Sequence, residues 1–410
     1  MQPGVVSTIP SDGWSGVRLA LRRTLIVCHD PPFPPTSGSD LRNFGNATAA
    51  AAFGPVCLAS LVPRTGEAQP DGLDIRLVEL GNNSDKRAPS LGWRRVRGES
   101  RISLPMLARL KALVQDFRPD TIVVEGVALF KLLAPLRPMA RQLILDMHNV
   151  ESDLADQLPR KKSWRPFSSS VRPLEKKAAS IVDRIWVCSK LDGERLEAVV
   201  HPRIPVHVVP NGIPRPDSMP KSLPPQPAVS GGFPLILYVG HLGYEPNIDA
   251  AERLAHTILP RIRERLPAAK LVLAGRSPKP SARVLAGLNG VSLIKDPDDI
   301  RPLLSAAHLT IVPLAMGGGT RIKILEAMAW GLPVIATPLA VEGLGLIEDE
   351  EVLLSETDED LARLAIELCQ DRARIVGLRA RAYDGAWSRF GPEAIRDAVR
   401  QGLGPDGAVR

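Results

Sequence analysis

One segment of the chain, residues 317–336, combines a triple glycine, two cations and a carboxylate within a few residues. Glycines allow a ligand to approach the backbone closely, and the start of a helix offers free N–H groups and about half a positive charge. Arg and Lys can neutralise a diphosphate, and a carboxylate accepts hydrogen bonds from ribose hydroxyls. The segment therefore predicts a site for a nucleotide sugar or a similar ligand. The residues expected to form this site are Gly317, Gly318, Gly319, Thr320, Arg321, Lys323 and Glu326.

The elements around this segment are expected to place it at the edge of a parallel sheet. Leu309–Leu314 and Pro333–Thr337 are typical of buried strands, with a helix between them that the glycines open. Ligands bind where the carboxyl ends of such strands meet helix N-termini. The structural alternative is that Lys323 and Glu326 form only a solvated pair on an amphipathic helix. A P-loop is excluded, because no Gly-Lys-Ser/Thr follows the glycines.

A second candidate lies near the start of the chain. Thr24–Cys28 is expected to be a buried strand, followed by a proline-rich loop and a helix over 41–52. This order places Gly38 at a helix start that faces a cleft. The alternative is a loop that Ser39 or Asp40 merely caps. The loop lacks the G-x-G-x-x-G pattern, which disfavours a nicotinamide or flavin cofactor.

His148 is the third candidate. It follows the expected strand Leu143–Asp146, at the strand end where cleft residues lie. A histidine there could hydrogen-bond a sugar hydroxyl or orient an acceptor. A lone histidine is more often structural, and Asp146 and Glu151 are weaker candidates for a supporting role.

Length and pattern predict two α/β domains. The chain has 410 residues, 44% of them hydrophobic, and short aliphatic runs alternate with amphipathic helices. A proline-rich stretch marks the boundary between the domains. We expect an extension over 1–22, a first domain over 23–213, a linker over 214–233, a second domain over 234–385 and a crossing helix with a tail over 386–410.

The positive charge of the chain is concentrated in its first half. Residues 1–205 carry 29 Lys and Arg against 21 Asp and Glu, whereas the remainder carries 23 against 24. Basic clusters lie beside tryptophans at 93–97 and 160–165. These clusters are either solvated loops or a surface for an anionic membrane or a phosphate-bearing acceptor. Nucleic-acid binding is disfavoured, because aromatic residues make up only 4% of the chain and no recognition motif is present.

Other patterns limit the possible classes. No apolar run is long enough to span a membrane and no signal peptide is evident. We therefore expect a cytoplasmic protein that could associate peripherally with the inner face of the membrane. The four cysteines are far apart and predict buried thiols rather than a disulfide frame or a zinc site. The D-x-D strings at 296–298 and 358–360 are typical of helix caps, so no metal site is expected.

Several motifs occur in the order and spacing of one family. The chain resembles the retaining, nucleotide-sugar-dependent glycosyltransferases of the GT-B fold, the family 4-like group 1 enzymes. The resemblance covers residues 206–345. It rests on Val208–Ile213 (VVPNGI), Leu237–Asn247 (LYVGHLGYEPN), Leu271–Arg276 (LVLAGR), Asp298–Leu314 and the triple-glycine segment.

The resemblance implies two doubly wound, Rossmann-like domains that face each other across a cleft, with a final helix returning to the first domain. It implies that the second domain binds the donor, with Gly240 and Arg276 joining the triple-glycine segment. The loop at Gly38 would lie near the donor phosphate as well as the acceptor, with Gly38 as a donor-binding residue, and the loop at His148 would face the acceptor. We expect this acceptor to be a polysaccharide or a lipid-linked glycan precursor. It also implies retention of configuration by front-face attack, without a cofactor.

Two departures from the family pattern leave alternatives open. A Glu is frequent eight positions before Glu326, where this chain has Gly318. Family members also commonly place a Lys after the Arg at a longer spacing than that between Arg321 and Lys323. Arg276 and Arg321 are competing candidates for the main diphosphate contact. The chain could also be a nucleotide-sugar 2-epimerase, or a protein that binds a nucleotide sugar without catalysis, since a fold does not fix a function.

Overall fold

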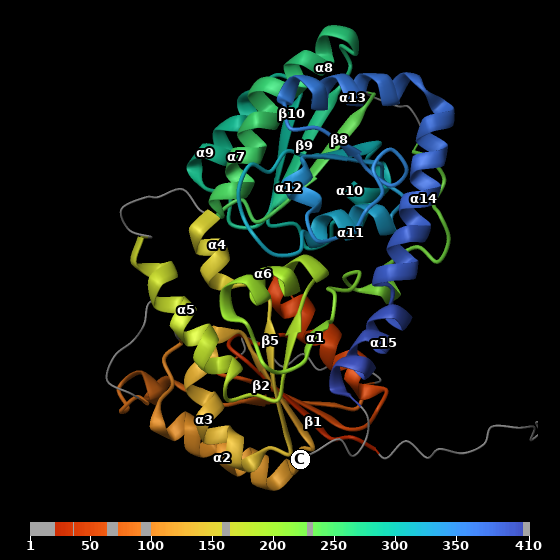
Figure 1. Cartoon of the computed structure of the whole chain (residues 1–410). Coiled ribbons are helices and arrows are strands. Elements are labelled where there is room, and N and C mark those ends of the chain that lie inside the picture. The colour runs from red at the N-terminus through yellow and green to blue at the C-terminus, as the bar shows by residue number, and fades with distance from the viewer. Residues whose placement is uncertain are drawn as a thin grey trace, which may run out of the picture.

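The computed structural model describes residues 21–35, 37–63, 73–91, 100–157, 165–227 and 233–404. Two α/β domains lie one above the other, joined by the chain at two places (Figure 1). The strands of the N-terminal domain are β1 (Thr24–Cys28), β2 (Val56–Ser60), β3 (Ile75–Glu79), β4 (Thr121–Glu125), β5 (Gln142–Met147), β6 (Arg184–Val187) and β7 (Val206–Val208). Its helices are α1 (Gly38–Ala51), α2 (Leu104–Phe117), α3 (Leu133–Leu136), α4 (Glu151–Gln157), α5 (Arg165–Ala179) and α6 (Lys190–Val200), with 3₁₀ turns η1 (Asn83–Lys86), η2 (Val127–Leu132) and η3 (Arg137–Met139).

The C-terminal domain repeats this alternation. Its strands are β8 (Leu235–Val239), β9 (Lys270–Gly275), β10 (Val291–Lys295), β11 (Leu309–Val312), β12 (Val334–Ala336) and β13 (Leu353–Leu354). The helices are α7 (Glu245–Arg253), α8 (Leu259–Arg265), α9 (Pro280–Val284), α10 (Arg301–Ala306), α11 (Ile322–Ala329), α12 (Pro338–Val341), α13 (Asp358–Gln370), α14 (Arg372–Phe390) and α15 (Pro392–Leu403). Shorter turns are η4 (Pro216–Ser218), η6 (Leu285–Gly287) and a π-helical turn (Leu254–Ile258) between α7 and α8.

Both sheets are parallel and share one winding. Their strand orders are β3-β2-β1-β4-β5-β6-β7 and β10-β9-β8-β11-β12-β13. The direction of winding reverses between β1 and β4 and again between β8 and β11, and ligands bind at such reversal points. The expected fold of two doubly wound domains is therefore confirmed, and the loops after β1, β4, β5, β8 and β11 lie where a site should form.

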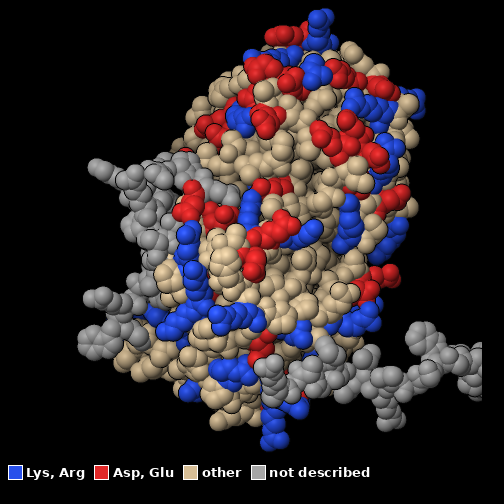
Figure 2. All heavy atoms as spheres, in the orientation of Figure 1, with Lys and Arg blue, Asp and Glu red and all other residues tan. Residues whose placement is uncertain are grey.

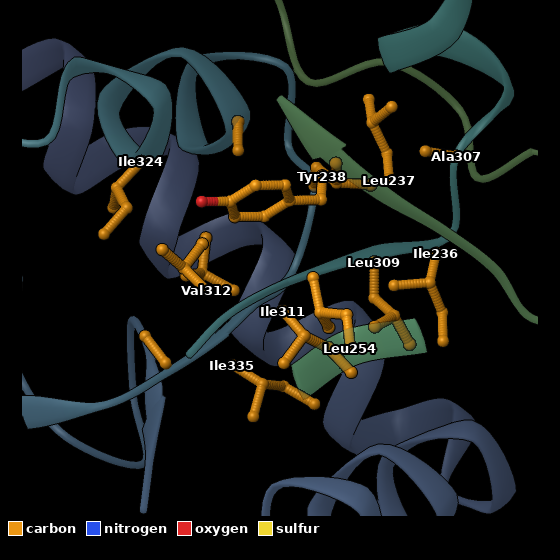
Figure 3. Packing of buried hydrophobic residues seen from close by; sticks show 14 of the residues in the cluster. Ile236, Leu237, Tyr238, Leu254, Ala307, Leu309, Ile311, Val312, Ile324 and Ile335 are labelled. Carbon is orange, nitrogen blue, oxygen red and sulfur yellow. The ribbon is translucent and has the colours of Figure 1, made fainter. Parts of the chain in front are cut away.

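Apolar side chains on both faces of each sheet hold these strands in place. Alternate β1 residues pack on opposite sides, so that Leu25 joins the core beneath α2 and α6, while Ile26 joins the core beneath α1 and α15. In the C-terminal domain, Tyr238, Ile311 and Ile324 belong to one core that links β8 and β11 to α11 (Figure 3). The position of α11 is thus fixed by its own apolar face.

The cap of α1 differs from the expected one. The helix starts at Gly38 rather than at residue 41, and its N-cap is Ser37, whose side chain accepts a hydrogen bond from the Asp40 amide. The Asp40 carboxylate in turn accepts from the Ser37 amide at 2.8 Å. This reciprocal capping box satisfies two backbone donors, and it explains why the helix begins three residues early.

The chain returns to the N-terminal domain at Gly391, after α14 has packed on the C-terminal core. The helix that lies on the N-terminal domain is α15, with Ile395, Val399 and Leu403 in the core beneath α1 (Figure 1). A backbone hydrogen bond of 2.9 Å from the Ile213 amide to the Phe390 carbonyl joins the two crossing segments. Residues 386–390 therefore continue α14, whereas we expected them to belong to the crossing helix.

A buried charged network fixes the loops of the N-terminal domain. The Arg42 guanidinium on α1 donates to Asp146 on β5 at 3.0 Å and to the Val209 carbonyl at 2.7 Å, and its third partner is Asn211 at 3.0 Å. Burial alone would raise the pKa of the Asp146 carboxyl, but Arg42 and the His148 ring together outweigh burial and lower this pKa to about 2. One arginine thus joins α1, β5 and the first crossing segment.

We predict that Arg42→Met lowers the free energy of unfolding of the N-terminal domain by about 3–5 kcal/mol at pH 7, because it leaves a buried carboxylate unpaired. In the unmutated protein, the stabilisation from Asp146 is present above its unfolded pKa, near ~4, and is lost as the pH falls toward about 2. The deficit of the variant should shrink on acidification, since a protonated Asp146 needs no cation. Urea unfolding at pH 7 and pH ~4 measures both effects.

The control is Arg137→Met, which removes the half-exposed ion pair of Arg137 with Asp183. Such a pair is expected to contribute about 0–1 kcal/mol. An equal loss in the two variants would contradict the role given to Arg42.

Candidate functional site

A cavity of about 750 Å³ lies between the two domains. This volume is within the usual range of ligand pockets. The C-terminal domain contributes the loop after β11 and the first residue of α11, and the N-terminal domain contributes the loops after β1, β4 and β5. The predicted residues that line the cavity are Gly38, His148, Gly318, Gly319 and Thr320.

The triple glycine forms a loop rather than the start of the helix. Gly317 and Gly319 have φ angles of 115° and 75°, which no residue within a right-handed helix adopts. As a result α11 begins only at Ile322, with Arg321 as its N-cap. The prediction that the glycines open the helix is wrong in this respect, because their backbone turns in the left-handed region before the helix begins.

Arg321 points into this loop. Its guanidinium donates to the Gly317 carbonyl at 2.7 Å and also to the Gly319 carbonyl, and the residue is only 8% exposed. Arg321 therefore folds the glycine loop on itself and contributes positive charge from beneath it. Arg276, the competing candidate for the diphosphate contact, is exposed directly after β9 and does not line the large cavity.

Lys323 lies behind the loop, against β8. Its Nζ donates to Asn247 Oδ1 at 2.8 Å and to the Tyr238 hydroxyl at 3.1 Å. It also lies 4.4 Å from the centre of the Tyr238 ring. Burial, followed by the charge of Arg321, lowers the pKa of Lys323 to about 7. A Cβ at Gly240 would lie 3.0 Å from Nζ, so this glycine leaves room for the ammonium group.

Glu326, one turn further along α11, faces a second cavity of about 100 Å³. The residue is 8% exposed, and burial raises the pKa of its carboxyl to about 7. Its nearest cation is Arg215, with Nη2 3.7 Å from Oε1. Asp298, Asp299 and Arg301 line the same cavity. The sequence analysis missed Arg215, which it assigned to the linker, although Arg215 follows the VVPNGI motif by only two residues.

The opposite wall of the large cavity is built from three strand ends. The His148 ring lies between two carboxylates, with Nδ1 3.7 Å from Glu125 Oε1 and Nε2 3.7 Å from Asp146 Oδ2. Glu125 Oε2 accepts a hydrogen bond of 2.8 Å from the His29 amide. The sequence analysis also missed Glu125. Its position at the end of β4, beside the winding reversal, was the signal that could have indicated it.

Glycines allow the two walls to meet. A Cβ at Gly318 would lie 2.5 Å from Leu154 on α4, and one at Gly319 would lie 2.6 Å from Asn149 Oδ1. Gly38 faces Ile322 across the interface, where a Cβ would have a normal contact of 3.6 Å. The departure at Gly318 therefore has a steric counterpart, since a glutamate there would overlap Leu154 in this arrangement.

The two D-x-D strings do not line the large cavity. In the second string, Asp360 accepts from the Thr357 hydroxyl in the cap of α13, as expected, and Asp358 pairs with Arg253. In the first string, the expected cap is wrong for Asp296, which accepts from the Ser277 amide, because α10 begins only after Ile300. Within the described ranges, no group of three His, Cys, Asp or Glu side chains could hold a metal ion. The four cysteines are free thiols.

Some of the residues expected to contact a membrane lie in the described part of the chain, and others lie outside it. No helix in the described part of the chain is long and apolar enough to cross a membrane. The basic clusters at 93–97 and 160–165 lie outside the described residues, apart from the backbone at 165. Other exposed cations remain on α5, at Arg172, Lys176 and Lys177. Lys and Arg gather over the N-terminal domain on the face in Figure 2, whereas both signs alternate over the C-terminal domain.

Comparison with known proteins assigns both halves of the chain. Residues 37–212 match the glycosyl transferase 4-like domain, and residues 233–371 match the glycosyl transferases group 1. A curated relative, an uncharacterized 44.6 kDa protein in the cps region of Klebsiella pneumoniae, is 23% identical over 158 residues. That match covers 36% of this chain and 40% of the relative.

Solved structures share the whole architecture. Sucrose-phosphate synthase from Thermosynechococcus elongatus superposes with a TM-score of 0.71 at 19% identity, over 93% of this chain and 98% of that one. HepE from Anabaena, in complex with UDP and glucose, superposes with a TM-score of 0.66 at 13% identity, over 93% and 99%. These likenesses confirm the GT-B fold, and with the two family matches they show that the chain belongs to the group 1, family 4-like glycosyltransferases.

Proposed function

We propose that this protein transfers a sugar from a nucleoside-diphosphate sugar to a hydroxyl of a glycan or lipid-linked acceptor, with retention of configuration. The observation that carries the proposal is the placement of α11. Its glycine loop faces the interdomain cavity. Among the described residues, neither Lys323 nor Glu326 has an oppositely charged side chain within hydrogen-bond distance. Strongly shifted titratable groups beside a cavity are typical of functional sites.

The donor would lie along α11. The diphosphate would contact the glycine loop, with positive charge from Lys323 and, beneath the loop, from Arg321. The ribose hydroxyls would bind Glu326, beside Arg215. The complex of HepE with UDP and glucose supports a donor of this class on this fold.

The chemistry needs fixed positive charge where the leaving group develops negative charge. Preorganised donors and cations stabilise that charge, and positioning does the rest. In this proposal the loop amides, Arg321 and Lys323 supply the charge, so that no metal ion or cofactor is needed. Retention by front-face attack rests on the family resemblance. His148, on the opposite wall, would contact the acceptor.

We predict that one nucleoside diphosphate of a panel (UDP, GDP, ADP and dTDP) raises the thermal midpoint of the protein. Binding to the folded state alone stabilises it by roughly 2.7 kcal/mol at about 100 times Kd. The stabilisation should be clearly smaller in Glu326→Ala, which removes the ribose contact, and in Lys323→Met, which removes the cation. The control is Glu264→Ala, at an exposed position of α8, which should leave the shift unchanged.

Stabilisation by none of the four nucleotides, or an equal shift in all variants, would contradict the donor site. With the preferred donor in hand, product analysis separates the alternatives. Glycoside formation supports transfer, conversion of the donor sugar alone indicates an epimerase, and binding without any turnover indicates a non-catalytic protein.

We further propose that the acceptor is presented on the cytosolic side of an anionic membrane. The support is the excess of positive charge in residues 1–205 and the exposed cations of α5. Such residues contribute about 1 kcal/mol each near an anionic leaflet. We predict that the protein co-sediments with vesicles containing phosphatidylglycerol and is released by salt. Equal recovery with pure phosphatidylcholine vesicles would rule this out.

A further inference from the structure

The acceptor-facing wall of the large cavity is acidic. Of the titratable residues on this wall, Asp30, Glu125 and Glu151 are carboxylates that lie opposite the glycine loop. This wall contrasts with the basic exterior of the same domain (Figure 2). Arg42 and Arg101 also line the cavity, but the carboxylates outnumber them there.

Glu125 is held rigidly at the centre of this wall. It ends β4, its side chain is 13% exposed, and the His29 amide fixes Oε2 at 2.8 Å. Within the described part of the chain, Oε1 accepts no hydrogen bond, and the closest basic group is the His148 ring at 3.7 Å. The carboxylate is thus oriented by the backbone and keeps one oxygen for a donor that enters the cavity.

The two arginines of the wall form their hydrogen bonds elsewhere and do not pair with Glu125 or Glu151. Arg42 is committed to Asp146 and to the Val209 carbonyl. Arg101 donates to the backbone carbonyls of Asp85 and Ala88. Among the described residues, neither Glu125 nor Glu151 forms an ion pair with a lysine or an arginine.

Three further groups on the wall suit a polyhydroxyl ligand. Glu151 Oε1 accepts a hydrogen bond of 3.2 Å from the Asn149 amide group. His148 Nε2 and Asn149 Oδ1 are buried polar atoms without a hydrogen-bond partner within the described structure. Sugar hydroxyls both donate and accept, so they can satisfy carboxylate, imidazole and amide groups together.

We propose that Glu125 binds a hydroxyl of the acceptor, and that this wall selects a neutral, polyhydroxylated sugar over one with a carboxylate or phosphate near the reacting hydroxyl. The inference rests on the proposed transferase function and adds the class of the acceptor's reacting end. A hydroxyl donates a charge-assisted hydrogen bond to a carboxylate, whereas an anionic substituent in the cavity is repelled at low effective dielectric. Anionic groups further along the acceptor remain compatible with the basic exterior.

The test uses the full chain, the donor found in the nucleotide panel, and matched acceptor pairs. Octyl glucoside is compared with octyl glucuronide, and octyl galactoside with octyl galacturonide, because each pair differs only at C6. The neutral member should have a kcat/KM at least about tenfold higher. Glu125→Gln should reduce this preference by a similar factor, since its amide oxygen still accepts from the His29 amide while the charge is lost.

The control is Glu197→Gln, at a position of α6 with a 64% exposed side chain, which should keep both the rates and the preference. Thermal stabilisation by the nucleotide should be unchanged in Glu125→Gln, which shows that the variant is folded and binds donor. The proposal is overturned if the uronides are preferred, if Glu125→Gln leaves the preference unchanged, or if no neutral glycoside is used while donor still binds. Failure of every nucleotide to bind would instead contradict the transferase function itself.

Discussion

The structure depends on helix α11, which carries an enclosed cation and a buried carboxylate that do not neutralise each other. Lys323 is held by two neutral oxygens, and Glu326 has only Arg215 nearby, at 3.7 Å. Enclosed charges without close counter-charges are unfavourable. Burial therefore lowers the pKa of Lys323 to about 7 and raises the pKa of Glu326 to about 7. The apolar face of α11, fixed in the C-terminal core, keeps both groups in place. A nucleoside diphosphate would supply the two missing partners, phosphate for one and hydroxyls for the other.

The second constraint is the close contact of the two domains around this helix. Gly318 and Gly319 lie directly against α4 and the loop before it, and an ion pair of 2.7 Å between Arg195 and Glu342 also bridges the domains. Any side chain at these glycines would push the walls apart. The small size of the glycines therefore allows the close contact of the two domains beside the cavity.

The sequence allowed the architecture and the main strand ends to be predicted. Aliphatic runs and their order indicated parallel sheets, and the strand ends placed His148 and the glycine loop at a cleft. Both line the large cavity in the structure. The direction of Arg321 could not be predicted, because its partners are carbonyl oxygens exposed by the left-handed turns of its own loop. Arg215 and Glu125 were missed for another reason. Each contacts a residue far along the chain, Glu326 for Arg215 and His148 for Glu125. The strand end could have indicated the position of Glu125, but no local pattern encodes either contact.

The most direct test of the account is the pH dependence of nucleoside-diphosphate affinity, measured by titration calorimetry. The proposed donor site requires protonated Lys323 and ionised Glu326, and the pKa of each side chain is about 7. The account predicts an affinity maximum close to this pH, with a fall above it that disappears in Lys323→Met and a fall below it that disappears in Glu326→Gln. An affinity that is unaffected by pH in this range, or limbs that persist in both variants, would show that these two side chains do not hold the donor.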